Sequence, residues 1–164
     1  MGPSVLESLR ALGYLRGVPH PSSAHWTLRC DGGARGNPGP GALGYSLVDP
    51  SGREVEARGE ILGVVTNNVA EYRALIAGLE SAARHGADPL RVCLDSELVV
   101  RQMTGVYRVK QAGLKPLHAE AARAAARLGS VQFVAVRRED NARADQIVNQ
   151  TLDRAPDMSS ESPR

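Results

Sequence analysis

Four carboxylate side chains in this sequence stand where predicted strands end or predicted helices begin. Asp31 and Asp95 each close an apolar segment that has the pattern of a strand. Glu71 and Asp145 each fall near the start of a segment with helical spacing. Four such oxygen donors at one sheet edge would repel one another unless divalent cations lay between them. Two ions about 3.5–4 Å apart activate a water and stabilise the leaving oxygen of a phosphodiester. The set therefore indicates metal-assisted hydrolysis of a nucleic acid backbone.

Each acid also has a purely structural interpretation. Asp31 precedes a stretch rich in Gly and Pro, and Asp is a common turn former. Glu71 lies three residues after Asn68, which is typical of a capping box. Asp95 or Ser96 is suited to cap a short helix that follows. The dipole of the last helix by itself favours an acid such as Asp145 in its first turn. The sequence leaves these interpretations open.

The elements that must position the acids are those of an α/β domain. Residues 42–48 and 54–62 flank a hairpin turn, so with residues 26–31 they are expected to form an antiparallel meander. The later elements are expected as helix 68–86, strand 90–95, short helix 96–103, helix 117–128, strand 131–136 and helix 141–152. The helical crossover makes strand 90–95 parallel to strand 26–31. Asp31 and Asp95 then lie together at the carboxyl edge, where open α/β sheets bind ligands.

The composition is that of an ordinary globular domain. The 164 residues are 42% hydrophobic and 23% charged, and the formal net charge of +2 permits nucleic acid binding without arguing for it. No apolar run approaches the roughly 18 residues of a membrane-spanning helix, and the first residues lack the pattern of a signal peptide. Cys30 and Cys93 are expected on opposite faces of the sheet, so they cannot bridge. Two buried thiols favour a cytoplasmic location.

Both ends of the chain are expected to lie outside the catalytic domain, which we place at residues 25–152. Residues 1–24 are expected to form an extension, with a short amphipathic helix over residues 5–15 and then a linker rich in Gly, Pro and Ser. Residues 153–164 are polar and are expected to form a disordered tail. The protein is expected to act as a monomer.

The connector at residues 104–116 carries a basic patch. Arg108, Lys110 and Lys115 are interleaved with Tyr107, and basic residues with an aromatic ring among them can follow a phosphate backbone. A solvated loop is the simpler interpretation of the same residues. Both interpretations stay open, with Arg108 and Lys110 as the candidate substrate contacts.

The chain resembles the ribonuclease HI family through four motifs in order. They are Asp31-Gly32-Gly33 with Gly36-Asn37-Pro38-Gly39-Pro40-Gly41, Thr66-Asn67-Asn68 followed by Glu71, Leu94-Asp95-Ser96, and Arg138 with Asn141, Ala144 and Asp145. The resemblance covers about residues 25–152. It implies an α/β RNase H-like fold, which is a five-stranded mixed sheet with three antiparallel and two parallel strands and with helices on both faces.

The same resemblance implies an endoribonuclease that hydrolyses the RNA strand of RNA/DNA hybrids by a two-metal-ion mechanism, leaving 5′-phosphate and 3′-hydroxyl ends. It assigns two Mg²⁺ ions, with Mn²⁺ as the substitute, to Asp31, Glu71, Asp95 and Asp145. It assigns four residues to the minor groove of the hybrid: Gly36, Asn37, Asn67 and Asn68. Such groups can hydrogen-bond RNA 2′-hydroxyls and so distinguish RNA from DNA. The implied partner is an RNA/DNA hybrid, with double-stranded RNA as a second candidate.

Three features depart from the family pattern. Bacterial members often carry a His in the loop before the last acid, thought to assist proton transfer, whereas residues 137–144 contain none. The basic helical protrusion that many members use to grip substrate is replaced by the connector 104–116. Glu97 stands where many members have a Gln that contacts substrate. The trimmed form resembles the archaeal-type and plant-type branch, which implies weaker substrate binding and a preference for Mn²⁺.

Two other function classes stay open, because sharing a fold does not settle function. One is a binding module that has kept the fold and lost turnover, against which all four acids count. The other is a different phosphoryl-transfer enzyme on the same fold, such as a resolvase or a transposase-type recombinase. Against it stand Thr66-Asn67-Asn68 and Gly36-Asn37, an RNA-contacting set with no evident use on DNA alone.

Overall fold

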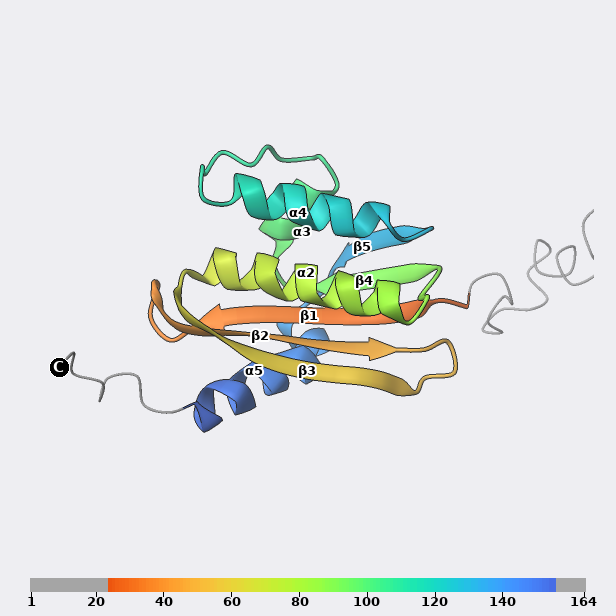
Figure 1. Ribbon diagram of the computed structural model, residues 1–164, viewed down its shortest axis with the longest axis horizontal. Helices are drawn as coiled ribbons and strands as arrows, with labels where there is room; N and C mark the ends of the chain where they lie inside the picture. Colours follow the sequence, from red (N-terminus) through yellow and green to blue (C-terminus); the bar gives the residue numbers. More distant parts are fainter. Residues whose placement is uncertain (1–23, 156–164) are drawn as a thin grey trace, which may run out of the picture.

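The computed structural model describes residues 24–155, and Figure 1 shows a sheet covered by helices. The strands are β1 (Trp26–Ala34), β2 (Gly39–Val48), β3 (Glu54–Val65), β4 (Leu90–Leu94) and β5 (Val131–Ala135). The helices are α2 (Asn67–Arg84), α3 (Glu97–Met103), α4 (Lys115–Ala126), the 3₁₀ helix η2 (Arg138–Asn141) and α5 (Ala142–Arg154). Each strand and helix expected between residues 26 and 152 is present, with bounds that differ by a few residues.

The sheet is mixed, with the strand order β3-β2-β1-β4-β5. β1, β2 and β3 form the expected antiparallel meander. β4 runs parallel to both β1 and β5, and its pairing with β1 ends at Arg29↔Cys93. The arrangement confirms the expected five-stranded sheet.

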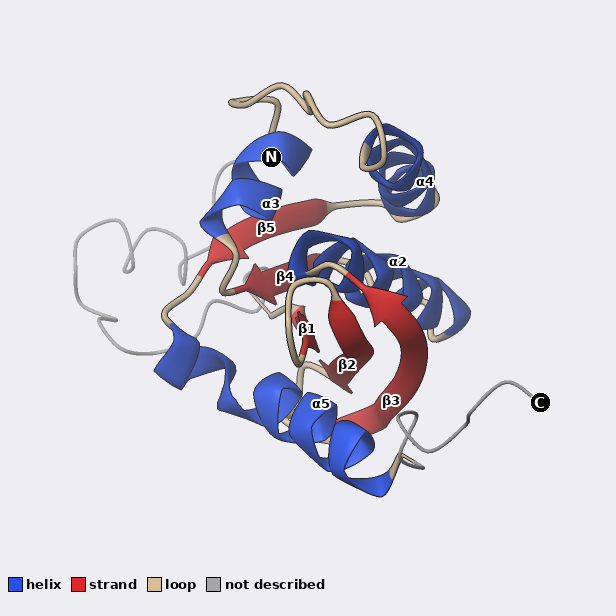
Figure 2. Ribbon diagram, turned by 90° about the vertical axis from the view of Figure 1, so that its left-hand side faces the viewer, coloured by secondary structure: helices blue, strands red, loops and turns tan. Residues whose placement is uncertain are grey.

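Helices cover both faces of this sheet (Figures 1 and 2). α2 lies across β1 and β2 and packs against α4, whereas α5 crosses the opposite face against β1, β2 and β3. The shorter α3 lies near β4 and β5. The layering confirms the expected α/β architecture.

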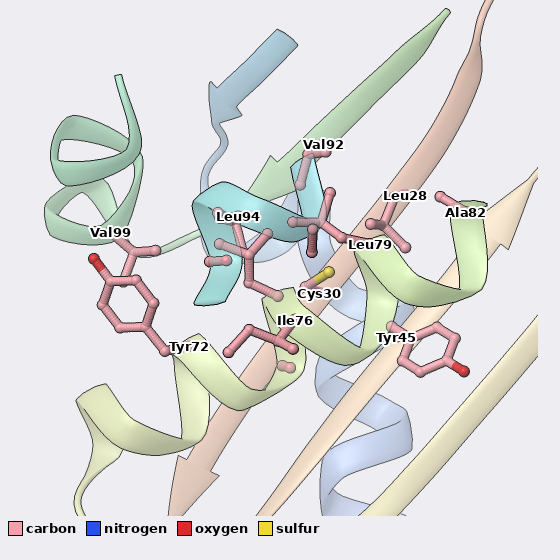
Figure 3. Packing of buried hydrophobic residues seen from close by; sticks show 14 of the residues in the cluster. Leu28, Cys30, Tyr45, Tyr72, Ile76, Leu79, Ala82, Val92, Leu94 and Val99 are labelled. Carbon is pink, nitrogen blue, oxygen red and sulfur yellow. The ribbon is translucent and has the colours of Figure 1, made fainter. Parts of the chain in front are cut away.

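The main core lies between the sheet and α2 (Figure 3). Leu28 and Cys30 of β1 and Val92 of β4 pack on this face with Tyr72 and Leu79 of α2, and all five are fully buried. Burying a large apolar side chain contributes about 1.5–3 kcal/mol. This packing therefore fixes α2, and the acid near its start, against β1.

The two cysteines lie on opposite faces of the sheet, as expected. Cys30 belongs to the α2-side core, whereas Cys93 pairs with Arg29 and so faces the other way, because side chains alternate along a strand. Both thiols are buried and free.

β1 does not end at Asp31, so that boundary was wrong. Antiparallel pairing with β2 continues to Ala34↔Gly41, which makes several of the expected turn glycines into strand residues. Gly32 permits this because the backbone of α2 passes directly over it. A Cβ at this position would lie 2.2 Å from the carbonyl carbon and oxygen of Ala70. The glycine stretch thus serves the close approach of a helix to the strand.

Replacing Gly32 by Ala should destabilise the protein by about 3 kcal/mol or more, because the added methyl group meets backbone that cannot rotate away. Gly33→Ala is the matched control, since a Cβ there meets nothing closer than Val148 Cγ1 at 4.0 Å. Thermal unfolding of both variants measures the difference. Equal melting temperatures would contradict the close approach of α2 to β1.

Some sequence predictions fall outside the described residues. They are the short helix over residues 5–15, the linker after it, and most of the C-terminal tail. The tail was expected from residue 153, but α5 extends to Arg154, so its first two residues are helical. No helix between residues 24 and 155 is long and apolar enough to cross a membrane.

Candidate active site

A cleft of about 510 Å³ opens at the sheet edge where β4 ends. Its lining comes from β1, the loop after β1, the start of α2, the residues after β4, η2 and α5. The charged residues that line it are Asp31, Arg35, Glu71, Asp95, Arg138 and Asp145. The fold therefore brings all four sequence-predicted acids to one cleft.

Asp31 is carried by a rigid part of β1. It lies beyond Arg29, the last β1 residue paired with β4, but β1 remains paired with β2 here through Asp31↔Gly44. Because side chains alternate along the strand, Cys30 enters the α2-side core and Asp31 faces the α5 side. Only 7% of Asp31 is exposed. Its carboxyl group is thus held on a fixed backbone and largely removed from water.

Glu71 does not close a helix cap, so the expected capping box with Asn68 is wrong. The N-cap of α2 is Thr66, whose hydroxyl accepts a hydrogen bond from the amide of Val69 at 3.3 Å. Since the threonine takes the cap position, Glu71 falls deeper in the helix and reaches across to β1. There its Oε1 accepts a hydrogen bond from the amide of Gly32 at 3.0 Å. The glutamate side chain is oriented toward the cleft by the strand that carries Asp31.

Asp95 follows the last residue of β4. The cap of α3 is made by Ser96, whose hydroxyl accepts a hydrogen bond from the amide of Val99 at 3.3 Å. Of the two capping candidates, the serine therefore performs that role. The carboxylate of Asp95 is left to face the cleft.

Three of the acids meet closely enough to share a ligand. One carboxylate oxygen from each of Asp31, Glu71 and Asp95 lies within 4.8 Å of the others. Glu71 Oε2 is buried and has no hydrogen-bond partner among residues 24–155. Burying a polar atom without a partner costs free energy, and carboxylate oxygens are the ligands that Mg²⁺ and Mn²⁺ prefer. The donor set and the unpartnered oxygen together fit a divalent cation.

Asp145 joins this trio from the first turn of α5. Its Oδ1 lies 3.7 Å from Arg138 Nη2, and its Oδ2 accepts a hydrogen bond from Asn149 Nδ2 at 3.3 Å. Its charge also raises the pKa of Asp31. Asp145 thus belongs to the same charge cluster, although its carboxylate is more exposed than that of Asp31.

Burial and mutual repulsion raise the pKa values of Asp31, Glu71 and Asp95. Burial raises the pKa of Asp31 from 3.8 to about 7, and the charges of Asp95 and Asp145 add to this effect. Burial, and then the charge of Asp31, raise the pKa of Glu71 well above its usual value. Burial also raises the pKa of Asp95, against the opposing effect of the Arg138 guanidinium. Without a cation the cluster is partly protonated at neutral pH, so cation binding releases protons.

Millimolar Mg²⁺ or Mn²⁺ should therefore stabilise the folded protein. A cation present at a hundred times its Kd adds about 2.7 kcal/mol by mass action, which for a domain of this size raises the melting temperature by about 5–10 °C. Differential scanning fluorimetry, with NaCl at matched ionic strength as the control, measures the shift. An unchanged melting temperature in both metals would contradict a cation site at the cluster.

Asn141 holds two parts of the site together, a role that the sequence did not reveal. The sequence predicts that its side chain caps the last helix, but it makes no capping hydrogen bond. The side chain is fully buried, and its Nδ2 donates to the carbonyl oxygen of Cys30 at 2.8 Å. This bond joins the residue before Asp31 to the start of the helix that carries Asp145.

Of the four residues predicted to contact the minor groove of the hybrid, two line the cleft and two lie in the loop between β1 and β2. Asn67 Oδ1 accepts a hydrogen bond from the amide of Ala34 at 2.9 Å, and the Asn67 amide donates to Asn37 Oδ1 at 3.0 Å. Asn67 and Asn68 line the cleft directly. Gly36 sits in the turn beside them with φ of +99°, a conformation that favours glycine. The loop after β1 and the start of α2 are thus fastened to each other.

Arg108 and Lys110 lie elsewhere. They line a separate groove of about 590 Å³ between α3 and the connector that follows it. Leu98 and Gln102 of α3 line this groove, whereas Ser96, the N-cap residue of the same helix, lines the acidic cleft. The structure does not bring the two basic residues into the acidic cleft, and their contact with substrate stays a prediction.

Known proteins resemble this chain in both sequence and fold. A family model described as reverse transcriptase-like matches residues 29–151. The crystal structure of RNase H1 from Halobacterium salinarum is similar with a TM-score of 0.77 and 39% identity, over 79% of this chain and 98% of that one. The chain belongs to the ribonuclease HI family. This confirms the resemblance carried by the four motifs.

Other ribonuclease HI relatives agree with this assignment. LC11-RNase H1, whose crystal structure contains an RNA/DNA hybrid, is 43% identical with a TM-score of 0.74, over 78% of this chain and 96% of that one. Among curated relatives, ribonuclease HI of H. salinarum is 41% identical over 125 residues, which are 76% of this chain and 63% of that protein. The bifunctional protein Rv2228c of Mycobacterium tuberculosis is 41% identical over 130 residues, 78% of this chain and 35% of that protein. The chain thus spans less than two thirds of these curated relatives.

Proposed function

We propose that this protein is an endoribonuclease that hydrolyses the RNA strand of RNA/DNA hybrids. The observation that carries the proposal is the trio of carboxylates within 4.8 Å of one another, with a buried glutamate oxygen that no donor satisfies in the described part of the chain. Family membership supports it, because LC11-RNase H1 has been crystallised with an RNA/DNA hybrid. Cleavage leaves 5′-phosphate and 3′-hydroxyl ends if the 3′ oxygen is the leaving group.

In this proposal, two divalent ions are held by Asp31, Glu71, Asp95 and Asp145. Mg²⁺ is the expected ion, and Mn²⁺ is the substitute. When bound, such ions lower the pKa of a water and stabilise charge on the leaving oxygen. The protein itself fixes the ligands, because Asp31 stands on a paired strand and the amide of Gly32 orients Glu71. This rigidity lowers the cost of arranging the site before the reaction.

Recognition of the RNA strand is assigned to the loop after β1 and the start of α2. The Asn67 amide, Asn67 Oδ1 and Asn37 Oδ1 already bond within the protein. The groups assigned to RNA 2′-hydroxyls are therefore the amide of Gly36 and the side-chain Nδ2 groups of Asn37, Asn67 and Asn68. The hydrogen bond from the Asn67 amide to Asn37 Oδ1 holds the two segments in register. Selection of RNA by this surface is what separates the proposed enzyme from a nuclease that acts on DNA alone.

Arg138 occupies the loop in which bacterial members often carry a His. Its guanidinium lies 3.7 Å from Asp145 Oδ1 and lowers the pKa of Asp95 by its charge. A guanidinium donates hydrogen bonds but keeps its protons, so it can attract a phosphodiester and cannot relay a proton. We therefore assign proton transfer at this site to water. The two free cysteines support a cytoplasmic protein, and we propose a monomer.

A panel of four labelled duplexes tests this proposal. RNA/DNA hybrid, double-stranded RNA, double-stranded DNA and a hybrid with a single ribonucleotide are incubated with the protein in Mg²⁺ and in Mn²⁺, and the product ends are identified by their response to phosphatase and ligase. We expect cutting of the hybrid RNA strand only. Cutting of DNA duplexes at an equal rate would favour another phosphoryl-transfer enzyme, and binding without cutting would favour a binding module.

A further inference from the structure

An ion pair links the loop after β1 to the last turns of α5. Arg35 Nη2 lies 2.6 Å from Asp153 Oδ1, and both side chains are more than half exposed. Arg35 lines the acidic cleft, as does Leu152, the neighbour of Asp153. The pair therefore stands at the margin of the proposed active site and involves none of its four acids.

The backbone under Arg35 is fixed, whereas its guanidinium is not. Its amide donates to the carbonyl oxygen of Pro40 at 2.8 Å, and the preceding amide, from Ala34, donates to Asn67 Oδ1 at 2.9 Å. The loop is also tightly folded, since a Cβ on Gly39 would lie 2.2 Å from the Arg35 carbonyl oxygen. Exposed ion pairs are weak and exchange easily with other partners. Arg35 thus has a fixed backbone and a guanidinium group whose partner, Asp153, can be replaced by another anion.

The other charges along the cleft show why the guanidinium of Arg35 matters. The acids that line it are accompanied by two arginines, Arg35 and Arg138. Arg138 lies beside Asp145, so its charge is directed at the acid cluster. Asp153 follows Asp145 by eight residues, or about 12 Å along α5, the axial length of three to four nucleotide steps of one strand. A strand that lies along α5 with one phosphate at the acids would therefore bring a phosphate a few nucleotides away to Arg35, which lines the same cleft.

We propose that Arg35 binds a backbone phosphate of the hybrid and that Asp153 is its internal competitor. In the free protein the guanidinium pairs with the Asp153 carboxylate, and in the complex it exchanges this partner for a phosphate, which it can engage with two parallel hydrogen bonds. The inference rests on the proposed function. It adds that the enzyme weakens its own grip on nucleic acid through a carboxylate outside the catalytic set.

Hybrid affinity, measured in EDTA so that no cleavage occurs, tests the proposal across a range of salt concentrations. Arg35→Ala should weaken binding about tenfold at low salt and reduce the slope of log K against log salt by about one. Asp153→Asn should tighten binding by up to about fivefold, and should have no effect when combined with Arg35→Ala, because the two residues act on one contact. In the presence of metal, both single variants should change KM and leave kcat unaltered.

Arg154→Ala is the matched control, because it also removes one positive charge. Arg154 lies on α5 and lines a different cavity. An equal loss of affinity in Arg154→Ala would reduce the effect to overall charge and overturn the proposal. So would an unchanged salt slope in Arg35→Ala, or weaker binding in Asp153→Asn. If the wild-type protein binds and cuts hybrid while these outcomes occur, only this inference fails. If the wild-type protein neither binds nor cuts hybrid, the proposed function fails with it.

Discussion

Replacing Asp31 by Asn should abolish RNA hydrolysis and at the same time stabilise the metal-free protein. The amide has the same shape as the carboxyl group but carries no charge, so it removes one ligand and relieves the repulsion on Glu71, whose pKa the charge of Asp31 raises. Loss of a partner that only supports a metal ligand costs 10–100-fold in activity. Loss of the ligand itself should therefore cost more than about 100-fold.

Asp140→Asn provides the control for this substitution. Asp140 lies five residues before Asp145, outside the cleft lining, and pairs only with Arg137 in an exposed contact at 3.5 Å among the described residues. Its variant should match the wild-type protein in both activity and melting temperature. Rates of hybrid cleavage and thermal unfolding in EDTA measure the two effects. An Asp31→Asn protein that still cuts, or that melts below the wild-type protein in EDTA, would contradict the clustered arrangement.

The metal-free protein should lose stability as the pH rises from about 4 to about 7. The pKa of Asp31 is about 7 in the folded protein and 3.8 in its ordinary state, so the folded state binds the proton more tightly than the unfolded state does. A raised folded pKa stabilises the protein at low pH, and this contribution is lost as the pH passes through the window between the two values. The difference corresponds to roughly 4 kcal/mol. Glu71 acts in the same direction, because its pKa is raised as well.

Urea unfolding in EDTA at pH 4.5 and pH 7.5 measures this loss. In Asp31→Asn the loss should be smaller, since one of the two strongly shifted groups is gone and the Asp31 charge no longer adds to the burial that raises the pKa of Glu71. With saturating Mg²⁺ the wild-type protein should also lose its pH dependence near neutrality, because the cation takes the place of the protons. Stability that rises between the two pH values in EDTA would show that the acids do not repel one another, against the geometry described above.

The sequence predicted the pairing of the first four strands and the location of the acids well, for a physical reason. Alternating polarity fixes which face of a strand is buried, and a helical crossover fixes a parallel partner. Asp31 and Asp95 therefore had to meet at one sheet edge once their strands were placed. Glu71 and Asp145 were selected by their place near the starts of predicted helices, and the pattern placed those helices without showing how they approach the sheet.

What the sequence did not predict depends on contacts between distant segments. The glycines after Asp31 indicated a turn, but β1 continues through them because α2 passes over Gly32. Glu71 matched a capping box, but Thr66 makes the cap and frees the glutamate. Both cases are local rules overridden by tertiary packing. The hydrogen bond from Asn141 to the Cys30 carbonyl, across 111 positions of sequence, has no local signal of its own.

The placement of Arg108 and Lys110 illustrates a different limit. Sequence reasoning joined them to the substrate site because basic residues near an aromatic ring suit a phosphate backbone. The structure puts them in a separate groove between α3 and the connector that follows it. The affinity of Arg108→Ala for hybrid decides whether the groove takes part in binding. An unchanged affinity would remove these residues from the binding surface.

Cleavage of a hybrid labelled on each strand, by the wild-type protein and by Asp95→Asn, in Mg²⁺ and in Mn²⁺, shows whether the acid cluster is the site of RNA hydrolysis. We expect the wild-type protein to cut the RNA strand in at least one metal and to leave the DNA strand intact, and we expect Asp95→Asn to bind the hybrid without cutting it. Folded wild-type protein that cuts neither strand in either metal, or a variant that cuts as fast as the wild type, would contradict this assignment.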